Sequence, residues 1–175
     1  MFVQSRKVSR PNRSAKLADV HDRKTRSRNM AAIRGADTKP ELIIRRGLHA
    51  RGFRYRLHNR KLPGRPDLVL PRYQAVIFVN GCFWHGHDCP LFKWPKTREE
   101  FWRNKIGGNV ERDRKNQAAL KATGWRIGFV WECALKGKHR LQTTNVLELL
   151  GEWLEGDAAD CLIEGQGQET TDTLA

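Results

Sequence analysis

The stretch Ala75–Cys89, AVIFVNGCFWHGHDC, decides the fold of this 175-residue chain. Its first five residues, Ala75–Val79, are apolar and rich in β-branched side chains, which is typical of a buried strand. Directly after them the composition changes to cysteines, histidines and two adjacent aromatic residues. Because binding sites of α/β sheets form where strands end at their carboxyl edge, the sequence predicts a metal-bound loop at the end of a core strand.

Three further segments have the composition of strands. Apolar and basic residues alternate in Phe53–Leu57, which predicts a half-buried strand, and Asp67–Leu70 and Trp125–Trp131 are apolar runs that predict buried ones. The connections between the first three strands are short and favour pairing between neighbours. The sequence therefore predicts an α/β (α+β) fold with a central mixed β-sheet flanked by helices.

Helix-start patterns flank these strands. Thr38–Glu41 and Thr97–Glu100 both fit a capping box, and Thr143 or Thr144 can cap a last helix. Gly107-Gly108 is expected to interrupt the second helical segment. The expected helices cover residues 39–50, 97–106, 109–122 and 143–153.

Composition divides the chain into three parts. Residues 1–17 are basic, with scattered Ser, Asn and Pro, and are expected to form a disordered arm. Residues 18–155 carry the predicted strands and helices and are expected to form one folded domain. Residues 156–175 contain acids, Gly and Gln and are expected to be a mobile acidic tail.

Basic residues outnumber acidic ones by a wide margin. The chain has 33 Lys and Arg against 19 Asp and Glu, a net charge of +14, and six of the acids lie from Glu155 onward. The remainder is therefore more basic still, and such a surplus favours nucleic acid bound through its phosphates. The alternative is a soluble protein that is basic without a polyanionic partner.

Targeting signals are not evident in the sequence. No apolar run approaches the ~18 residues of a membrane span, and the basic start has no apolar centre of a secretory signal. We therefore expect a cytoplasmic protein with no membrane partner. In that compartment, the four cysteines are better interpreted as metal ligands or free thiols than as disulfides.

The cysteine and histidine spacing predicts a structural zinc site. Cys82, His87 and Cys89 follow one strand, and Cys133 follows a strand expected to lie beside it. Three thiolates and one imidazole form a closed zinc set, so this Zn²⁺ would fold the loop and would leave no open position for substrate. The alternative is three buried thiols and a surface histidine.

Carboxylates and one further histidine are candidates for catalysis. Asp67 starts a strand after a Gly-Arg-Pro turn, and with Glu41 nearby it could hold Mg²⁺ through hard oxygen ligands. The alternatives are a turn-capping Asp and a capping-box Glu. His85 could transfer a proton, with Asp113 orienting it. Their alternatives are an exposed loop histidine and a charge pair on a solvated helix face.

Aromatic residues lie in and beside the same loop. Phe83, Trp84 and Trp102 occur among basic residues, which suggests stacking on DNA bases or wedging between them. For Trp102, on a helix with Phe101 and Ile106, burial in the core is an equal alternative.

Five long motifs run through the chain: DVHDRKTRSRNMAAI (19–33), PGRPDLV (63–69), VIFVNGCFWHGHDC (76–89), TREEFWRNKIGGNVERDR (97–114) and GWRIGFVWECAL (124–135). Together they resemble the very short patch repair endonuclease family, Vsr. The resemblance covers about residues 18–153 and implies that residues 18–155 are a nuclease domain.

The resemblance implies a restriction-endonuclease-like core and a DNA endonuclease that nicks double-stranded DNA. The cut is expected 5′ of the T in T·G mismatches that arise from deaminated 5-methylcytosine. The implied cofactors are catalytic Mg²⁺ and structural Zn²⁺. The resemblance implies Mg²⁺ at Asp67 and the carbonyl of Val79, and proton transfer by His85 with support from Asp113 and Glu41. It implies Zn²⁺ bound by Cys82, His87, Cys89 and Cys133. It also implies intercalation by Phe83, Trp84 and Trp102, entry of Met30 and Ile33 from the opposite groove, and reading of the mismatch by Lys105 and Asn109.

One position departs from the familiar form of the family's motif. Asn80 stands where a histidine usually precedes the glycine, and Asn can orient water or phosphate but cannot carry a proton. His85 is then the single candidate base in the loop. The resemblance also implies a monomer, cytoplasmic and nucleoid-associated, with contacts to general mismatch-repair proteins and a repair polymerase. Alternative functions are a related restriction or homing-type nuclease, and a zinc-stabilised DNA-binding protein with a decayed site.

Overall fold

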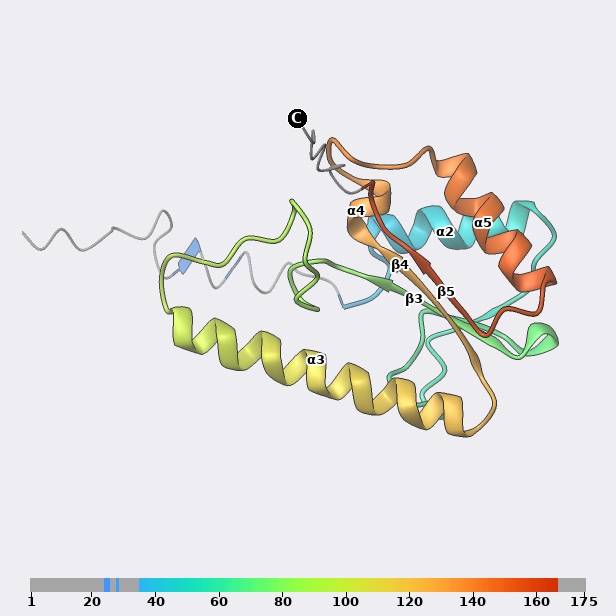
Figure 1. Cartoon of the computed structure of the whole chain (residues 1–175), viewed down its shortest axis with the longest axis horizontal. Coiled ribbons are helices and arrows are strands. Elements are labelled where there is room, and N and C mark those ends of the chain that lie inside the picture. The colour runs from blue at the N-terminus through green and yellow to red at the C-terminus, as the bar shows by residue number, and fades with distance from the viewer. Residues whose placement is uncertain (1–23, 26–27, 29–34, 167–175) are drawn as a thin grey trace, which may run out of the picture. The chain divides into compact units, whose positions relative to one another are not determined.

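The computed structural model describes residues 24–25, 28 and 35–166, and the chain divides into two compact units, residues 1–33 and 34–175. In the first unit the three described residues have helical backbone. The expected arm over residues 1–17 lies outside the described residues. All elements named below belong to the second unit (Figure 1). Within the described part of the chain, no helix combines the length and the apolar character that crossing a bilayer requires.

The second unit is built on a five-stranded sheet in the order β1-β2-β3-β4-β5, so the predicted mixed sheet is confirmed. The first three strands pair antiparallel, and β3, β4 and β5 pair parallel. The first strand is shorter than expected, two residues in place of five. The strands are β1 (Arg56–Leu57), β2 (Leu68–Leu70), β3 (Ala75–Asn80), β4 (Arg126–Trp131) and β5 (Asp160–Ile163).

Helices cover both faces of the sheet. The helices α2 (Lys39–Ala50) and α5 (Thr143–Glu155) pack on one face, and α3 (Glu99–Ala122) lies across the other (Figure 1). Alternate residues of the strands serve the two cores: Leu68 and Leu70 face α2 and α5, and Val69 packs with Leu120 of α3. Burial on both faces explains why β2 and the start of β3 read as continuous apolar runs.

The strand β5 corrects part of the expected mobile tail over residues 156–175, and residues 167–175 of that tail lie outside the described residues. Asp160–Ile163 pairs with β4 in parallel register, and Ile163 is buried in the core on the face of α2 and α5. An ion pair between Lys121 of α3 and Asp160 fixes the start of the strand. The sequence did not predict this four-residue strand, because the tail was assigned from composition and acidic residues surround the strand.

The helix α3 corrects the expected break at Gly107-Gly108, since it runs unbroken for 24 residues. Each glycine costs about 1 kcal/mol relative to alanine in a helix but creates no steric barrier to it. Burial of Ile106 on one side of the pair and Leu120 on the other holds the helix together. Its first turn is not capped by Thr97, because Arg98 occupies the N-cap position in a left-handed conformation without a side-chain bond.

The other two expected caps have different outcomes. Thr38 does cap α2, since its hydroxyl accepts a hydrogen bond from the Glu41 N–H at 3.4 Å. Neither Thr143 nor Thr144 caps α5, because the N-cap position is Gln142, which makes no side-chain bond there. The short helix α4 (Glu132–Leu135) directly follows β4 and carries Cys133.

Candidate active site and metal centre

Asp67 links the start of β2 to the end of β3. Its Oδ2 accepts a hydrogen bond of 2.7 Å from the backbone N–H of Val79. The antiparallel pairing of β2 with β3 places the residue before Leu68 beside the carboxyl end of β3. The carboxylate therefore lies where the sequence predicted it, next to the strand end from which the cysteine and histidine loop emerges.

Glu41 and His58 extend this acidic site. The Glu41 side chain is only 2% exposed, and its Oε1 lies 3.3 Å from Arg45 Nη1 and 3.2 Å from His58 Nε2. The approach to His58 is within ion-pair distance but lacks hydrogen-bond geometry. On its other side, His58 Nδ1 lies 3.9 Å from Asp67 Oδ1. His58 therefore connects the two carboxylates that the sequence singled out.

Sequence reasoning did not select His58 as a functional residue. A signal was available in the hairpin, because pairing of β1 with β2 places Leu57 opposite Leu68 and so brings position 58 next to Asp67. The His58 N–H donates to the Asp67 carbonyl at 3.4 Å. Its backbone has a φ of 46°, which ends the strand and turns the imidazole toward Glu41.

Burial raises the pKa of Asp67 to about 6. The hydrogen bond from Val79 lowers the pKa, the Glu41 carboxylate raises it, and the imidazoles of His58 and His85 lower it. Ionising the Asp67 carboxyl group therefore carries a desolvation cost.

The raised pKa of Asp67 predicts an unusual pH dependence of stability. The folded state holds this proton up to about pH 6, whereas the unfolded chain releases it near 3.8. The stability contributed by protonated Asp67 is therefore present below about pH 3.8 and is lost as the pH rises toward 6. Asp67→Asn, which keeps an oxygen acceptor for Val79, should raise the free energy of unfolding at pH 7.5 by about 1–3 kcal/mol.

Urea denaturation in Mg²⁺-free buffer at pH 4.5 and pH 7.5 measures this difference. The gain in free energy of unfolding should be much smaller at pH 4.5, where most of the cost of ionising buried Asp67 has not yet appeared. Equal gains at both pH values, or a loss at pH 7.5, would contradict a desolvated carboxylate at position 67.

His85 and Asp113 form a close pair. His85 lies in the loop after β3, and its Nδ1 is 2.6 Å from Oδ2 of Asp113 on α3. Both side chains are slightly more than a quarter exposed, so the pair is open to solvent on one side. With Nδ1 bound to the carboxylate, Nε2 is the atom free to exchange a proton with a substrate. Asn80, the last residue of β3, is 8% exposed.

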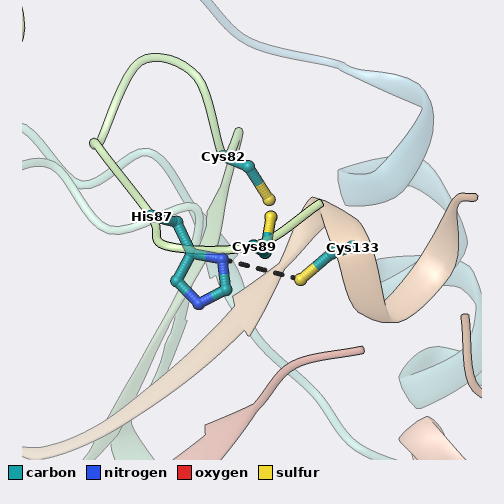
Figure 2. A group of neighbouring side chains, drawn as sticks. All are labelled: Cys82, His87, Cys89 and Cys133. Atoms are coloured by element: carbon teal, nitrogen blue, oxygen red, sulfur yellow. Dashed lines mark hydrogen bonds between the residues drawn. The ribbon is translucent and has the colours of Figure 1, made fainter. Parts of the chain in front are cut away.

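The four residues predicted to bind zinc converge on one point. Figure 2 shows three sulfurs and one imidazole nitrogen turned toward one another, and all four donor atoms lie within 4.8 Å of each other. The donors come from the loop after β3 (Cys82, His87 and Cys89) and from α4 (Cys133). None of the three cysteines is in a disulfide.

This donor set fits a soft divalent cation. Burial raises the pKa of the Cys82 and Cys133 thiols, so neither is readily ionised without a cation beside it. A bound metal would offset that cost by its charge, and three thiolates with one imidazole would make a closed set of four donors. A metal bound by these four residues would therefore hold the loop after β3 against α4.

The three predicted wedge residues lie together. Phe83 is 5.2 Å from Trp84 and 5.3 Å from Trp102 between ring centroids, and the two tryptophans are 6.1 Å apart. All three are intermediate in exposure, so neither full burial nor a fully free position describes them. Phe92 and Phe101 extend the cluster on either side.

The helix α3 supports this aromatic cluster. Asn109 donates a hydrogen bond of 2.9 Å from Nδ2 to the Trp84 carbonyl, and it is seven residues from Trp102, on the same face of the helix. Lys105 lies exposed on the same helix. Met30 and Ile33, the other predicted DNA-contacting residues, lie outside the described residues.

Comparison with known proteins gives consistent matches. A family model described as DNA mismatch endonuclease Vsr matches residues 18–91. The DNA mismatch endonuclease Vsr of Escherichia coli (strain K12) is 50% identical over 151 residues, which are 86% of this chain and 97% of that protein. The type II nicking enzyme V.XorIIP of Xanthomonas oryzae pv. oryzae is 45% identical over 68% of this chain and 89% of its own length. The type II nicking enzyme V.NmeAIP of Neisseria meningitidis is 43% identical over 70% and 87%.

Proposed function

Because this chain belongs to the family of DNA mismatch endonuclease Vsr, we propose that it nicks one strand of double-stranded DNA 5′ of the T in a T·G mismatch. It is a DNA endonuclease, a hydrolase acting on phosphodiester bonds, and it serves DNA repair. The basic surplus of the chain supports a phosphate-rich partner. The T·G pairs that it acts on would arise by deamination of 5-methylcytosine.

The observation that carries this proposal is the placement of two groups at the carboxyl end of β3: Asp67 is bonded to the Val79 N–H, and His85, in the loop that follows the same strand, is bonded to Asp113. A hydrolytic nuclease needs a carboxylate for a metal and a proton-transfer group at the same phosphate. Asp67, whose carboxylate accepts a hydrogen bond from the Val79 N–H, and the carbonyl of Val79 would hold Mg²⁺, and His58 lies between Asp67 and Glu41. When bound, Mg²⁺ supplies charge stabilisation for the phosphate and activates water.

The chain's own groups perform the remaining chemistry. His85 would move a proton at Nε2, because its Nδ1 is already bound to Asp113. Asp113 would keep the imidazole in one tautomer and orientation. Asn80, buried at the end of β3, would orient water or phosphate by hydrogen bonding and transfer no proton.

The aromatic cluster would supply the selectivity. Phe83, Trp84 and Trp102 would wedge beside the mismatch, and Met30 and Ile33 would enter from the opposite groove. A T·G wobble pair stacks and pairs less well than a Watson–Crick pair, so separating its neighbours costs less. Lys105 and Asn109 would then read the base edges. Asn109 would exchange its bond to Trp84 for one to a base.

Three finer assignments follow from the family. The metal at Cys82, His87, Cys89 and Cys133 would be structural Zn²⁺, which the three-sulfur, one-nitrogen donor set supports. The core would be restriction-endonuclease-like, which a mixed sheet with helices on both faces supports. The protein would act as a monomer on the cytoplasmic nucleoid and would meet general mismatch-repair proteins and a repair polymerase at the nick.

A nicking assay on matched duplexes tests this function. T·G, G·C and A·T duplexes in several flanking contexts are compared with and without Mg²⁺. Nicking of only the T·G duplex, only with Mg²⁺, is the expected result. Equally fast cutting of fully paired DNA would favour a restriction or homing-type nuclease. Mismatch binding without any nicking would favour a DNA-binding protein with a decayed site.

A further inference from the structure

The carboxyl end of β5 lies against the Cys/His cluster. Parallel pairing of Val130 with Ile163 aligns the end of β4 with the end of β5. β4 continues into α4 and Cys133, and β5 continues into Glu164 and Gly165. The last described residues of the chain therefore reach the centre that the loop after β3 begins.

Two consecutive residues contact two different members of the cluster. Glu164 Oε2 accepts a hydrogen bond of 2.9 Å from His87 Nε2. The Gly165 N–H donates to Cys133 Sγ at 3.3 Å. Glu164 and Gly165 are therefore neighbours of the four donors and are not donors themselves.

The contact to Glu164 fixes which nitrogen of His87 faces the cluster. With the Nε2 hydrogen directed to a carboxylate, the lone pair of Nδ1 points to the donor group, and Nδ1 lies 3.6 Å from Cys133 Sγ (Figure 2). Trp131 stacks on the ring with centroids 4.0 Å apart and planes within 11°, so the ring plane is held too. The imidazole is thus oriented by two neighbours that bind no metal.

The contact to Cys133 requires glycine at position 165. A β-carbon there would lie 2.7 Å from the Cys133 carbonyl oxygen and 2.9 Å from that of His139, closer than side-chain atoms approach. The next residue ties the segment down, since the Gln166 N–H donates to the same His139 carbonyl at 2.9 Å. The close approach lets a backbone N–H reach the sulfur, where it stabilises negative charge.

We infer that the end of β5 completes the metal centre, with Glu164 as a positioning residue for His87 and the Gly165 N–H as a hydrogen-bond donor to the Cys133 thiolate. This inference rests on the zinc site assigned under the proposed function. It makes metal retention depend on a carboxylate that is not one of the four metal donors. Such outer partners typically change metal affinity by about 10–100-fold.

Zinc release measures the contribution of Glu164. Purified zinc-loaded protein is mixed with an excess of a chromophoric chelator, and the rate of zinc transfer is followed by absorbance. Glu164→Ala should release zinc about tenfold faster than the wild type, the lower end of the range because Glu164 is half exposed. Glu164→Gln should lie between the two, because a neutral amide accepts a weaker hydrogen bond. Glu155→Ala, at an exposed carboxylate of α5, is the matched control and should release zinc at the wild-type rate.

A second readout separates positioning from general stability. With Co²⁺ in place of Zn²⁺, Glu164→Ala should alter the visible absorption bands, which report the ligand geometry. Thermal unfolding of the metal-loaded variants checks that each is folded. Gly165→Ala should also speed zinc release, since its β-carbon displaces the N–H from Cys133.

The outcomes distinguish this inference from the function it builds on. Wild-type release rates and cobalt spectra in Glu164→Ala would overturn the role of Glu164. Absence of bound zinc from the wild type would overturn the zinc assignment itself and with it this inference. If the zinc-loaded wild type does not nick T·G duplexes, the proposed function is rejected and the role of Glu164 at the metal centre stands.

Discussion

Asp67→Asn is expected to reduce the rate of DNA nicking by at least about 10³-fold while leaving DNA affinity nearly unchanged. The neutral amide retains the acceptor for the Val79 N–H but removes the charge that a hard cation requires. Losing metal stabilisation of the phosphate costs several kcal/mol, and about 4 kcal/mol corresponds to a factor of 10³. Single-turnover nicking of a T·G duplex measures the rate. Fluorescence anisotropy of a labelled T·G duplex, with Ca²⁺ in place of Mg²⁺, measures the DNA affinity.

A matched control is Asp157→Asn, at an exposed carboxylate after α5, which should nick at the wild-type rate. The contrast is sharpened by stability, since Asp67→Asn is expected to be the more stable protein at pH 7.5. A more stable, binding-competent variant without activity cannot owe its defect to misfolding. Nicking by Asp67→Asn within tenfold of the wild type would remove Asp67 from the metal site.

His85→Ala is expected to reduce nicking by about 10²–10⁴-fold, the usual contribution of a positioned proton-transfer group. Its Nδ1 is bound to Asp113 at 2.6 Å, so Asp113→Asn should also slow nicking, but less, because the imidazole itself remains. Single-turnover rates across pH 5.5 to 9 measure both effects.

His49→Ala provides the control, since His49 is an exposed imidazole at the end of α2. Zinc content must be compared in parallel, because His85 is two residues from His87 in the same loop. Near-wild-type nicking by His85→Ala with its zinc retained would reject proton transfer by His85. It would also leave the bond to Asp113 with a structural role only.

Local patterns predicted the first four strands, the helix α2 and the convergence of the Cys/His set. Each of these depends on residues close in sequence or on a strand end, where the direction of the chain is known. The spacing of Cys82, His87 and Cys89 defines one loop, and Cys133 had only to lie at the end of the adjacent parallel strand. Placement of Asp67 beside Val79 followed from the short hairpin in the same way.

The misses depend on contacts between distant segments. Gly107-Gly108 lowers helix propensity locally, but packing of α3 on the sheet outweighs it. His58 gains its position from the register of β1 against β2, which periodicity alone does not give. The strand β5 forms because β4 offers a free edge and a place for Ile163 in the core. Acidic composition carried no information about that edge.

The metal centre draws on three segments that are far apart along the chain: the loop after β3, α4 and the end of β5. During synthesis, the first two leave the ribosome well before Glu164 and Gly165 do. Metal captured by the four donors alone would be held less firmly until the last strand docks. On the inference drawn above, maturation of the nuclease would be coupled to the completion of its own polypeptide, because a chain that ended before residue 164 would lack both outer contacts to the cluster.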